Sequence, residues 1–183
     1  MAKRRSRLPR NLGLLAVAGL LGWAGWQYWP DPQRRAAATT APVDACALAP
    51  APVLAQLIGR AAVEARRMPS ARDVPAASAC AWRFFGGRAE ARVFTAASLA
   101  RGAVALSPAD YFRSVVTGLE YEFKAPPDAV SGIGDEAVAA GFEGDGDVQQ
   151  IVVRRGDRVL ALQFQGLDRQ VAESFASALA ARL

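Results

Sequence analysis

The sequence predicts an α+β fold in which helices pack on one face of an antiparallel sheet, preceded by one N-terminal transmembrane helix. Three observations lead to this prediction. The first is an uncharged apolar run near the N-terminus, and the second is a set of short strand-like segments joined by hairpin turns. The third is the order of the segments, which alternates helices with groups of strands and lacks the βαβ rhythm of a parallel sheet.

The positive charge of the chain is concentrated in its first ten residues. Five of the 22 basic residues lie there without an acidic residue among them, so the 17 basic residues that follow equal the 17 acidic ones. In this later part, Lys and Arg alternate with Asp and Glu. A nucleic-acid-binding domain gathers its basic residues on one folded face, so we expect no nucleic-acid partner.

Histidine is absent from the chain. This excludes the commonest general base, the commonest zinc ligand and every nucleophile that a histidine activates. A length of 183 residues fits one domain beside a targeting segment. We therefore expect a binding or interaction module and not an enzyme, with no cofactor and with no catalytic, cofactor-binding or metal-binding residues. The sequence does not identify a small-molecule ligand.

Residues 12–29 form the predicted transmembrane signal-anchor helix. They carry no charge over about 18 positions, the lower limit for crossing a hydrocarbon core of roughly 30 Å. The basic tail 1–11 precedes them, which predicts a cytoplasmic N-terminus, and four aromatic residues gather at the far end, as at membrane interfaces. The chain is thus expected to be a single-pass membrane protein with a cytoplasmic N-terminus and an extracytoplasmic (periplasmic) C-terminal domain.

Two alternatives concern the same N-terminal region. A cleaved signal peptide would use the small residues Ala36 to Ala38, but two arginines separate this site from the apolar run, which favours the uncleaved anchor. Small residues also recur at intervals of three in the apolar run, and these would let another helix approach closely. The chain would then be a subunit of a membrane assembly; the residues are Gly13, Ala16, Gly19, Gly22 and Gly25.

Residues 30–43, rich in Pro, Ala and Thr, are predicted to be a flexible spacer, and the extracytoplasmic domain is expected to span 44–183. At the start of this domain, Pro52 to Ile58 has the pattern of a short helix followed by a glycine C-cap. Arg88 to Thr95 alternates charged and apolar residues, which predicts a half-buried strand.

Ser107-Pro108-Ala109-Asp110 is close to a capping box and predicts a helix from Pro108 to about Thr117, ended by Gly118. Beyond it, Glu120 and Glu122 would share one face of an extended segment. A carboxylate pair can perform general acid and base catalysis, so an envelope hydrolase is an alternative function. A solvated strand edge is the simpler interpretation.

Later segments predict turns, a hairpin and a final helix. Gly132 to Ala137 is interpreted as a turn with positive-φ glycines that starts a strand, since it lacks the context of a dinucleotide fingerprint. Glu143 to Asp147 has oxygen ligands at alternate positions, but a turn explains it better than calcium does. Two β runs, Val148 to Arg154 and Arg158 to Phe164, form a hairpin. Asp168 caps a helix running to Leu183.

Cys46 and Cys80 are the only cysteines. An even pair in an exported domain is most simply a disulfide. Closing a loop of about 34 residues stabilises a fold by roughly 3 to 4 kcal/mol. The bond would join the first helix to the strand that carries Trp82. A redox site favours a closer spacing, and a metal site needs more ligands.

Several short segments together resemble a group of small exported bacterial envelope domains of unknown function, many of them lipoproteins. The matching segments are Asp44–Leu48, Cys80–Trp82, Tyr111–Phe112, Gly132–Ala137 and Arg155–Asp157. The resemblance implies a PsbP-like fold with helices over an antiparallel sheet, and a disulfide between the two cysteines. It implies no catalytic residues. Since no lipid-acceptor Cys follows the apolar run, the expected anchor is the transmembrane helix and not a lipid.

Overall fold

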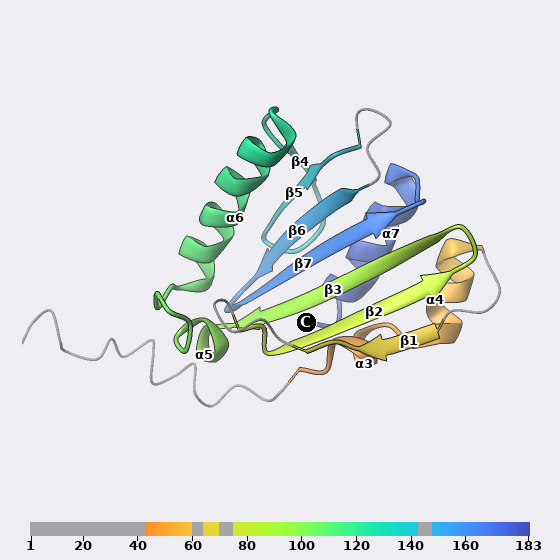
Figure 1. Ribbon diagram of the computed structural model, residues 1–183, viewed down its shortest axis with the longest axis horizontal. Helices are drawn as coiled ribbons and strands as arrows, with labels where there is room; N and C mark the ends of the chain where they lie inside the picture. The colour runs from red at the N-terminus through yellow and green to blue at the C-terminus, as the bar shows by residue number, and fades with distance from the viewer. Residues whose placement is uncertain (1–42, 60–63, 70–74, 143–147) are drawn as a thin grey trace, which may run out of the picture.

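The computed structural model describes residues 43–59, 64–69, 75–142 and 148–183. In these residues, a seven-stranded antiparallel sheet has the strand order β1-β2-β3-β7-β6-β5-β4 (Figure 1). The strands are β1 Glu64–Arg67, β2 Ser78–Phe84, β3 Gly87–Thr95, β4 Asp128–Ala129, β5 Glu136–Ala140, β6 Gln149–Arg155 and β7 Arg158–Gln165. The helices are α3 Ala45–Leu48, α4 Ala51–Ile58, α5 Ala96–Leu99, α6 Pro108–Phe123 and α7 Arg169–Ala180. The predicted α+β class with an antiparallel sheet is confirmed.

The predicted basic tail, the transmembrane helix and nearly all of the spacer lie outside the described residues, as do the small residues of the apolar run and Ala36 to Ala38. Within the ranges that the structure describes, no helix has both the length and the apolar character that crossing a membrane requires.

The prediction that helices pack on one face only is wrong, because helices cover both faces of the sheet. On one face, α3, α4 and α7 enclose a core around Trp82, Phe164 and Phe175. On the other face, α5 and α6 cover a second cluster. The physical reason lies in the central strands, where neighbouring residues such as Val152 and Val153 are both fully buried and point to opposite faces.

Helix α6 continues beyond Gly118, where the sequence predicted its end. Its start follows the prediction, since the Ser107 hydroxyl accepts a hydrogen bond from the Asp110 amide at 3.1 Å. Gly118 is exposed in the helix, and Lys124 ends the helix in the left-handed conformation. Burial of Leu119 on the sheet outweighs the cost of about 1 kcal/mol for a helical glycine.

The other predicted elements are confirmed, with small shifts at their ends. Helix α4 ends at Gly59, whose φ is 66°. The hairpin of β6 and β7 turns through Gly156. Asp168 caps α7 by accepting a hydrogen bond from the Val171 amide at 2.9 Å, and this helix ends at Ala180 and not at Leu183.

The predicted disulfide between Cys46 and Cys80 is present, with a Cα–Cα distance of 5.2 Å. It joins α3 to the middle of the adjacent strand β2. The N-cap of α3 is Asp44, whose side chain also forms an ion pair with Arg67 of β1. The domain therefore begins at a fixed point beside the edge strand β1.

Candidate anion-binding site

The register of β1, β2 and β3 places charged side chains of three strands on one face of the sheet. Across these strands, Glu64 lies opposite Arg83 and Arg83 lies opposite Arg88. One row further, Arg66 lies opposite Ala81 and Ala81 opposite Glu90. This is the face that α6 covers over β5, β6 and β7.

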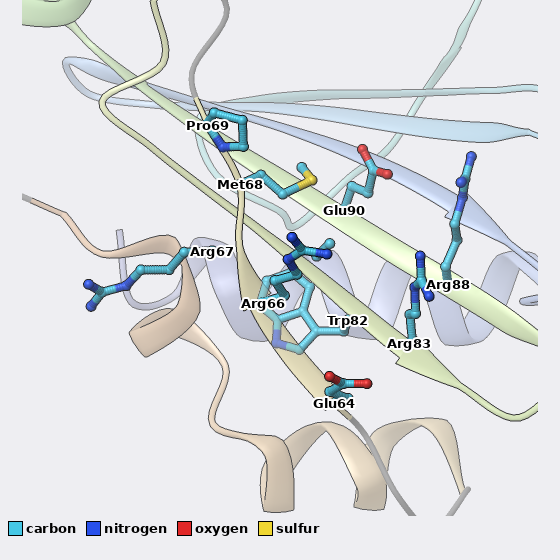
Figure 2. A pocket seen from close by; sticks show the side chains of 10 residues that line it. Glu64, Arg66, Arg67, Met68, Pro69, Trp82, Arg83, Arg88 and Glu90 are labelled. Atoms are coloured by element: carbon cyan, nitrogen blue, oxygen red, sulfur yellow. The ribbon is translucent and has the colours of Figure 1, made fainter.

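Because Ala81 is small and its neighbours in the register are long, the surface is hollowed above it. Figure 2 shows the side chains of residues that line this hollow. The cavity volume is about 280 Å³. We call this feature the arginine hollow; six of the residues that line it are Arg66, Met68, Ala81, Arg83, Arg88 and Glu90. Its floor and one wall are therefore apolar, while guanidinium groups stand around it.

Arg83 and Arg88 form a like-charge pair directly across two strands (Figure 2). Such pairs are destabilising because the Cβ atoms of facing residues lie only about 5 Å apart. In the described part of the chain, neither Arg83, Arg88 nor Arg66 comes within ion-pair distance of a carboxylate. Among the described residues, these three guanidinium groups of the hollow thus have no carboxylate partner.

The two acids that line the hollow, Glu64 and Glu90, form no ion pair with these three arginines, although Glu64 lies opposite Arg83 in the register. Glu90 is 3.7 Å from Arg92, which lies one register row further along β3. Arg67 also lines the hollow, but its side chain turns away from the group and pairs with Asp44 (Figure 2). A guanidinium group donates two parallel hydrogen bonds to phosphate or carboxylate oxygens. The arrangement is therefore suited to holding an anionic group, with Met68 and Ala81 available for an adjoining apolar part.

The predicted carboxylate pair is not formed. Glu120 and Glu122 lie on α6 and not on a strand, and helical residues two positions apart do not face each other. Both are exposed, and the Glu122 carboxylate accepts a hydrogen bond from the side-chain amide of Gln150 at 3.3 Å. Tyr121, which an extended segment would have placed on the opposite, buried face, is 77% exposed. The structure therefore does not bring these two carboxylates together on one face, as the hydrolase alternative required.

The segment Gly132 to Ala137 is a turn that starts β5, as predicted. Gly132 and Gly134 have φ values of 79° and 65°. The Asp135 carboxylate accepts hydrogen bonds from the Gly156 amide at 2.7 Å and from Arg154 at 3.2 Å. A second hollow of about 510 Å³ lies along this turn, but its two acids, Asp135 and Glu136, both pair with Arg154.

The candidate calcium segment, residues 143–147, lies outside the described residues. Among the residues that are described, no three His, Cys, Asp or Glu side chains are grouped so that they would hold a metal ion.

Sequence reasoning missed the arginine hollow. The alternation of basic and acidic residues predicted a mixed surface, whereas the register brings together arginines that are far apart in the chain. One signal was present in the sequence. Arg83 and Arg88 flank a short segment with two glycines, Phe84 to Gly87, and a tight hairpin there would make them face each other.

No protein-family model matches the chain, and no curated protein sequence matches it. The predicted resemblance to lipoprotein-like envelope domains with a PsbP-like fold therefore gains no support from these two comparisons. Among solved structures, the extracellular domain of PknH from Mycobacterium tuberculosis is similar, with a TM-score of 0.49 and 9% identity. The match covers 74% of this chain and 92% of that one. A likeness this distant assigns neither a family nor a ligand to the chain.

Proposed function

We propose that the chain is a membrane-anchored, extracytoplasmic binding module of the cell envelope, and that the arginine hollow binds an anionic group of its ligand. The observation that carries this proposal is the pair Arg83 and Arg88, two facing cations without a carboxylate partner among the described residues. An anion that bridges them would convert an unfavourable contact into two charge-assisted hydrogen bonds.

The disulfide supports the extracytoplasmic part of the proposal. Disulfides persist in oxidising compartments and are rare where glutathione and thioredoxin keep thiols reduced. The bond between Cys46 and Cys80 lies next to the strands that carry the hollow. The apolar run 12–29 would hold the domain near the membrane surface, with the N-terminus in the cytoplasm.

Binding without catalysis is the activity that we propose. The charged groups of the hollow are arginines and two glutamates, and arginine stays protonated at physiological pH. It is therefore a poor proton carrier but a good fixed countercharge. The ligand is proposed to be an anionic component of the envelope or an envelope protein with an exposed acidic group, and not a nucleic acid.

Titration with inorganic pyrophosphate tests the hollow. The full chain is placed in nanodiscs of phosphatidylcholine, and binding is measured by calorimetry in a chloride buffer. We expect saturable binding that falls at least about tenfold when Arg83→Gln and Arg88→Gln are combined, since each lost charge-assisted hydrogen bond is worth about 1.5 to 3 kcal/mol.

The matched control is Arg101→Gln, which removes one exposed positive charge just beyond α5, at the opposite end of β3 from Arg88. Its affinity for pyrophosphate is expected to stay at the wild-type value. Absence of saturable binding, or an equal loss in the control, would refute the anion site.

The compartment is tested on protein purified from membranes, by mass analysis of its N-terminus and its thiols. An intact N-terminus and no free thiol are expected. Two free thiols would place the domain in a reducing compartment and overturn the extracytoplasmic proposal.

A further inference from the structure

The turn between β2 and β3 exposes an aromatic ring at the end of the sheet. Phe84 pairs with Gly87, so the turn consists of Phe85 and Gly86, and Gly86 has a φ of 79°. The Phe85 side chain is 89% exposed. In Figure 1 this turn lies at the edge of the molecule, at the opposite end of β3 from α5. A ring in this position adds little to the core of the domain.

Two cations flank the turn that carries this ring. Arg83 and Arg88 are the first charged residues on either side of the turn, and they face each other across the strands. They also form one end of the arginine hollow. An exposed aromatic ring and two arginines without an ion-pair partner among the described residues thus occupy the same end of the same hairpin.

This combination matches the chemistry of an anionic membrane surface. Aromatic rings favour the interface between headgroups and acyl chains. Each Lys or Arg near an anionic leaflet adds electrostatic attraction, and burying a phenyl side chain at the interface adds a hydrophobic contribution. An acidic protein partner would account for the arginines but would not require the ring beside them.

We infer that the β2–β3 turn contacts the anionic lipid surface, with Phe85 entering the interface and Arg83 and Arg88 binding lipid phosphates. This inference rests on the proposed function and names the anionic ligand of the hollow as a phospholipid headgroup. The apolar lining at Met68 and Ala81 would then lie against the glycerol and upper acyl region.

The length of the chain before the domain permits this contact. Residues 30–42 separate the predicted membrane span from the first described residue, and 13 residues reach at most about 45 Å. The domain begins near the start of β2, where the Ala45 amide donates to the Ser78 hydroxyl at 3.0 Å. From there, the seven residues of β2 cover roughly 24 Å to the turn. A tether of this length also keeps the turn at a high effective concentration near the membrane.

The test measures the surroundings of position 85 in the full chain. Phe85→Cys is labelled with a fluorophore that responds to polarity, and the protein is placed in nanodiscs of phosphatidylcholine alone or mixed with phosphatidylglycerol. The native cysteines form the disulfide and are not expected to react. The matched control is the label at Tyr121→Cys on α6, a residue that is 77% exposed.

We expect the label at position 85 to shift to the blue and to lose most of its accessibility to acrylamide in the anionic discs. The label at position 121 should be unchanged between the two lipids. Combining Phe85→Cys with Arg83→Gln and Arg88→Gln should abolish the shift.

Each other outcome has a defined meaning. If position 85 responds equally in both lipids while pyrophosphate still binds through Arg83 and Arg88, the lipid inference is overturned and the proposed anion site stands. If positions 85 and 121 respond alike, the hairpin is not the contact and the inference is overturned. If pyrophosphate binding also fails, both the inference and the proposed function are overturned.

Discussion

Arginine side chains at the two edges of the sheet differ in whether they pair with carboxylates. At the edge formed by β4, β5 and β6, Arg154 donates to Glu136 at 2.9 Å and to Asp135 at 3.2 Å. Arg169 bonds Asp128 and Glu173 at 2.6 and 2.8 Å in the same region. At the edge formed by β1, β2 and β3, Arg66, Arg83 and Arg88 of the hollow pair with no carboxylate among the described residues.

The paired arginines, Arg154 and Arg169, have raised pKa values. The hydrogen bond to Glu136 raises the pKa of Arg154 above its usual value, and the hydrogen bonds to Glu173 and Asp128 do the same for Arg169. These groups join β5 to β6 and β4 to α7, so they belong to the fold. An arginine that is paired with carboxylates therefore belongs to the fold, whereas an arginine without such a partner is available to bind a ligand. The number of arginines alone does not distinguish the two.

The largest effect on stability is expected from the disulfide, which joins α3 to β2 at the edge of the sheet that carries the arginine hollow. Replacing both Cys46 and Cys80 by Ala should lower the free energy of unfolding by about 3 to 4 kcal/mol, because the closed loop restricts the unfolded chain. Urea unfolding measures this change, and reduced wild-type protein should behave in the same way. A loss below about 1 kcal/mol would show that the bond does not hold this edge of the sheet.

The edge of the sheet formed by β4, β5 and β6 depends on the glycine turn before β5. Gly134→Ala should destabilise the domain by about 2 to 3 kcal/mol, since a non-glycine residue at positive φ is strained. In addition, the new Cβ would lie 2.5 Å from the Val153 side chain and 2.6 Å from the Arg154 carbonyl oxygen. Thermal unfolding measures the change.

The matched variant is Gly118→Ala on α6, where an added Cβ meets no atom within 4 Å. It should stabilise the domain by up to about 1 kcal/mol, because alanine is the better helix former. A destabilised Gly118→Ala variant would argue against a helix that continues through this position.

The comparison between the two sets of arginines is tested by removing one charge at each edge. Arg154→Gln should cost about 1 to 2 kcal/mol, because it leaves Asp135 and Glu136 without their partner. Arg88→Gln should change stability by less than about 0.5 kcal/mol or stabilise the domain, since it removes a like-charge contact. Equal losses in urea unfolding would contradict the distinction between structural and free arginines.

A pH-dependent effect is expected from Tyr111, which packs on Phe94 with ring centroids 4.6 Å apart. Burial raises its pKa to about 12 from 10, while the nearby charge of Arg92 opposes the shift. Folding therefore favours the protonated phenol, so this stabilisation is complete below pH 10 and is lost as the pH rises towards 12. After allowing for solvent screening, the loss should be at most about 1 kcal/mol.

The control for this pH dependence is Tyr111→Phe, which cannot ionise. The difference in unfolding free energy between wild type and Tyr111→Phe should shrink or change sign between pH 10 and 12. A difference that stays constant over this range would show that the phenol is not shielded from solvent.

Much of the fold was predictable because local rules and tertiary packing agree. The alternation in Arg88 to Thr95, the cap at Asp168 and the hairpin through Gly156 all led to correct elements. The end of α6 was predicted wrongly because a glycine was given more weight than the burial of Leu119 beyond it. Strand β1 was missed because all four of its residues are exposed, and a strand without a buried face has no alternating pattern.

The candidate site was less predictable for a different reason. Arg66 and Arg83 come from different strands, and only the register of the sheet brings them around Ala81. The composition gives a net charge of zero after the N-terminal tail, but it does not show that the arginines are paired with acids at one edge of the sheet and not in the hollow at the other. By contrast, the disulfide could be predicted because the chain has only two cysteines.

A double-mutant cycle between Arg83 and Arg88 tests whether these two arginines form a ligand site or belong to the fold. The free energy of unfolding is measured for wild type, both single Gln variants and the double variant, first in chloride and then with pyrophosphate. We expect the two arginines to destabilise each other in chloride, and pyrophosphate to remove or reverse this unfavourable coupling. A favourable coupling in chloride that pyrophosphate leaves unchanged would show that the pair belongs to the fold and is not a ligand site.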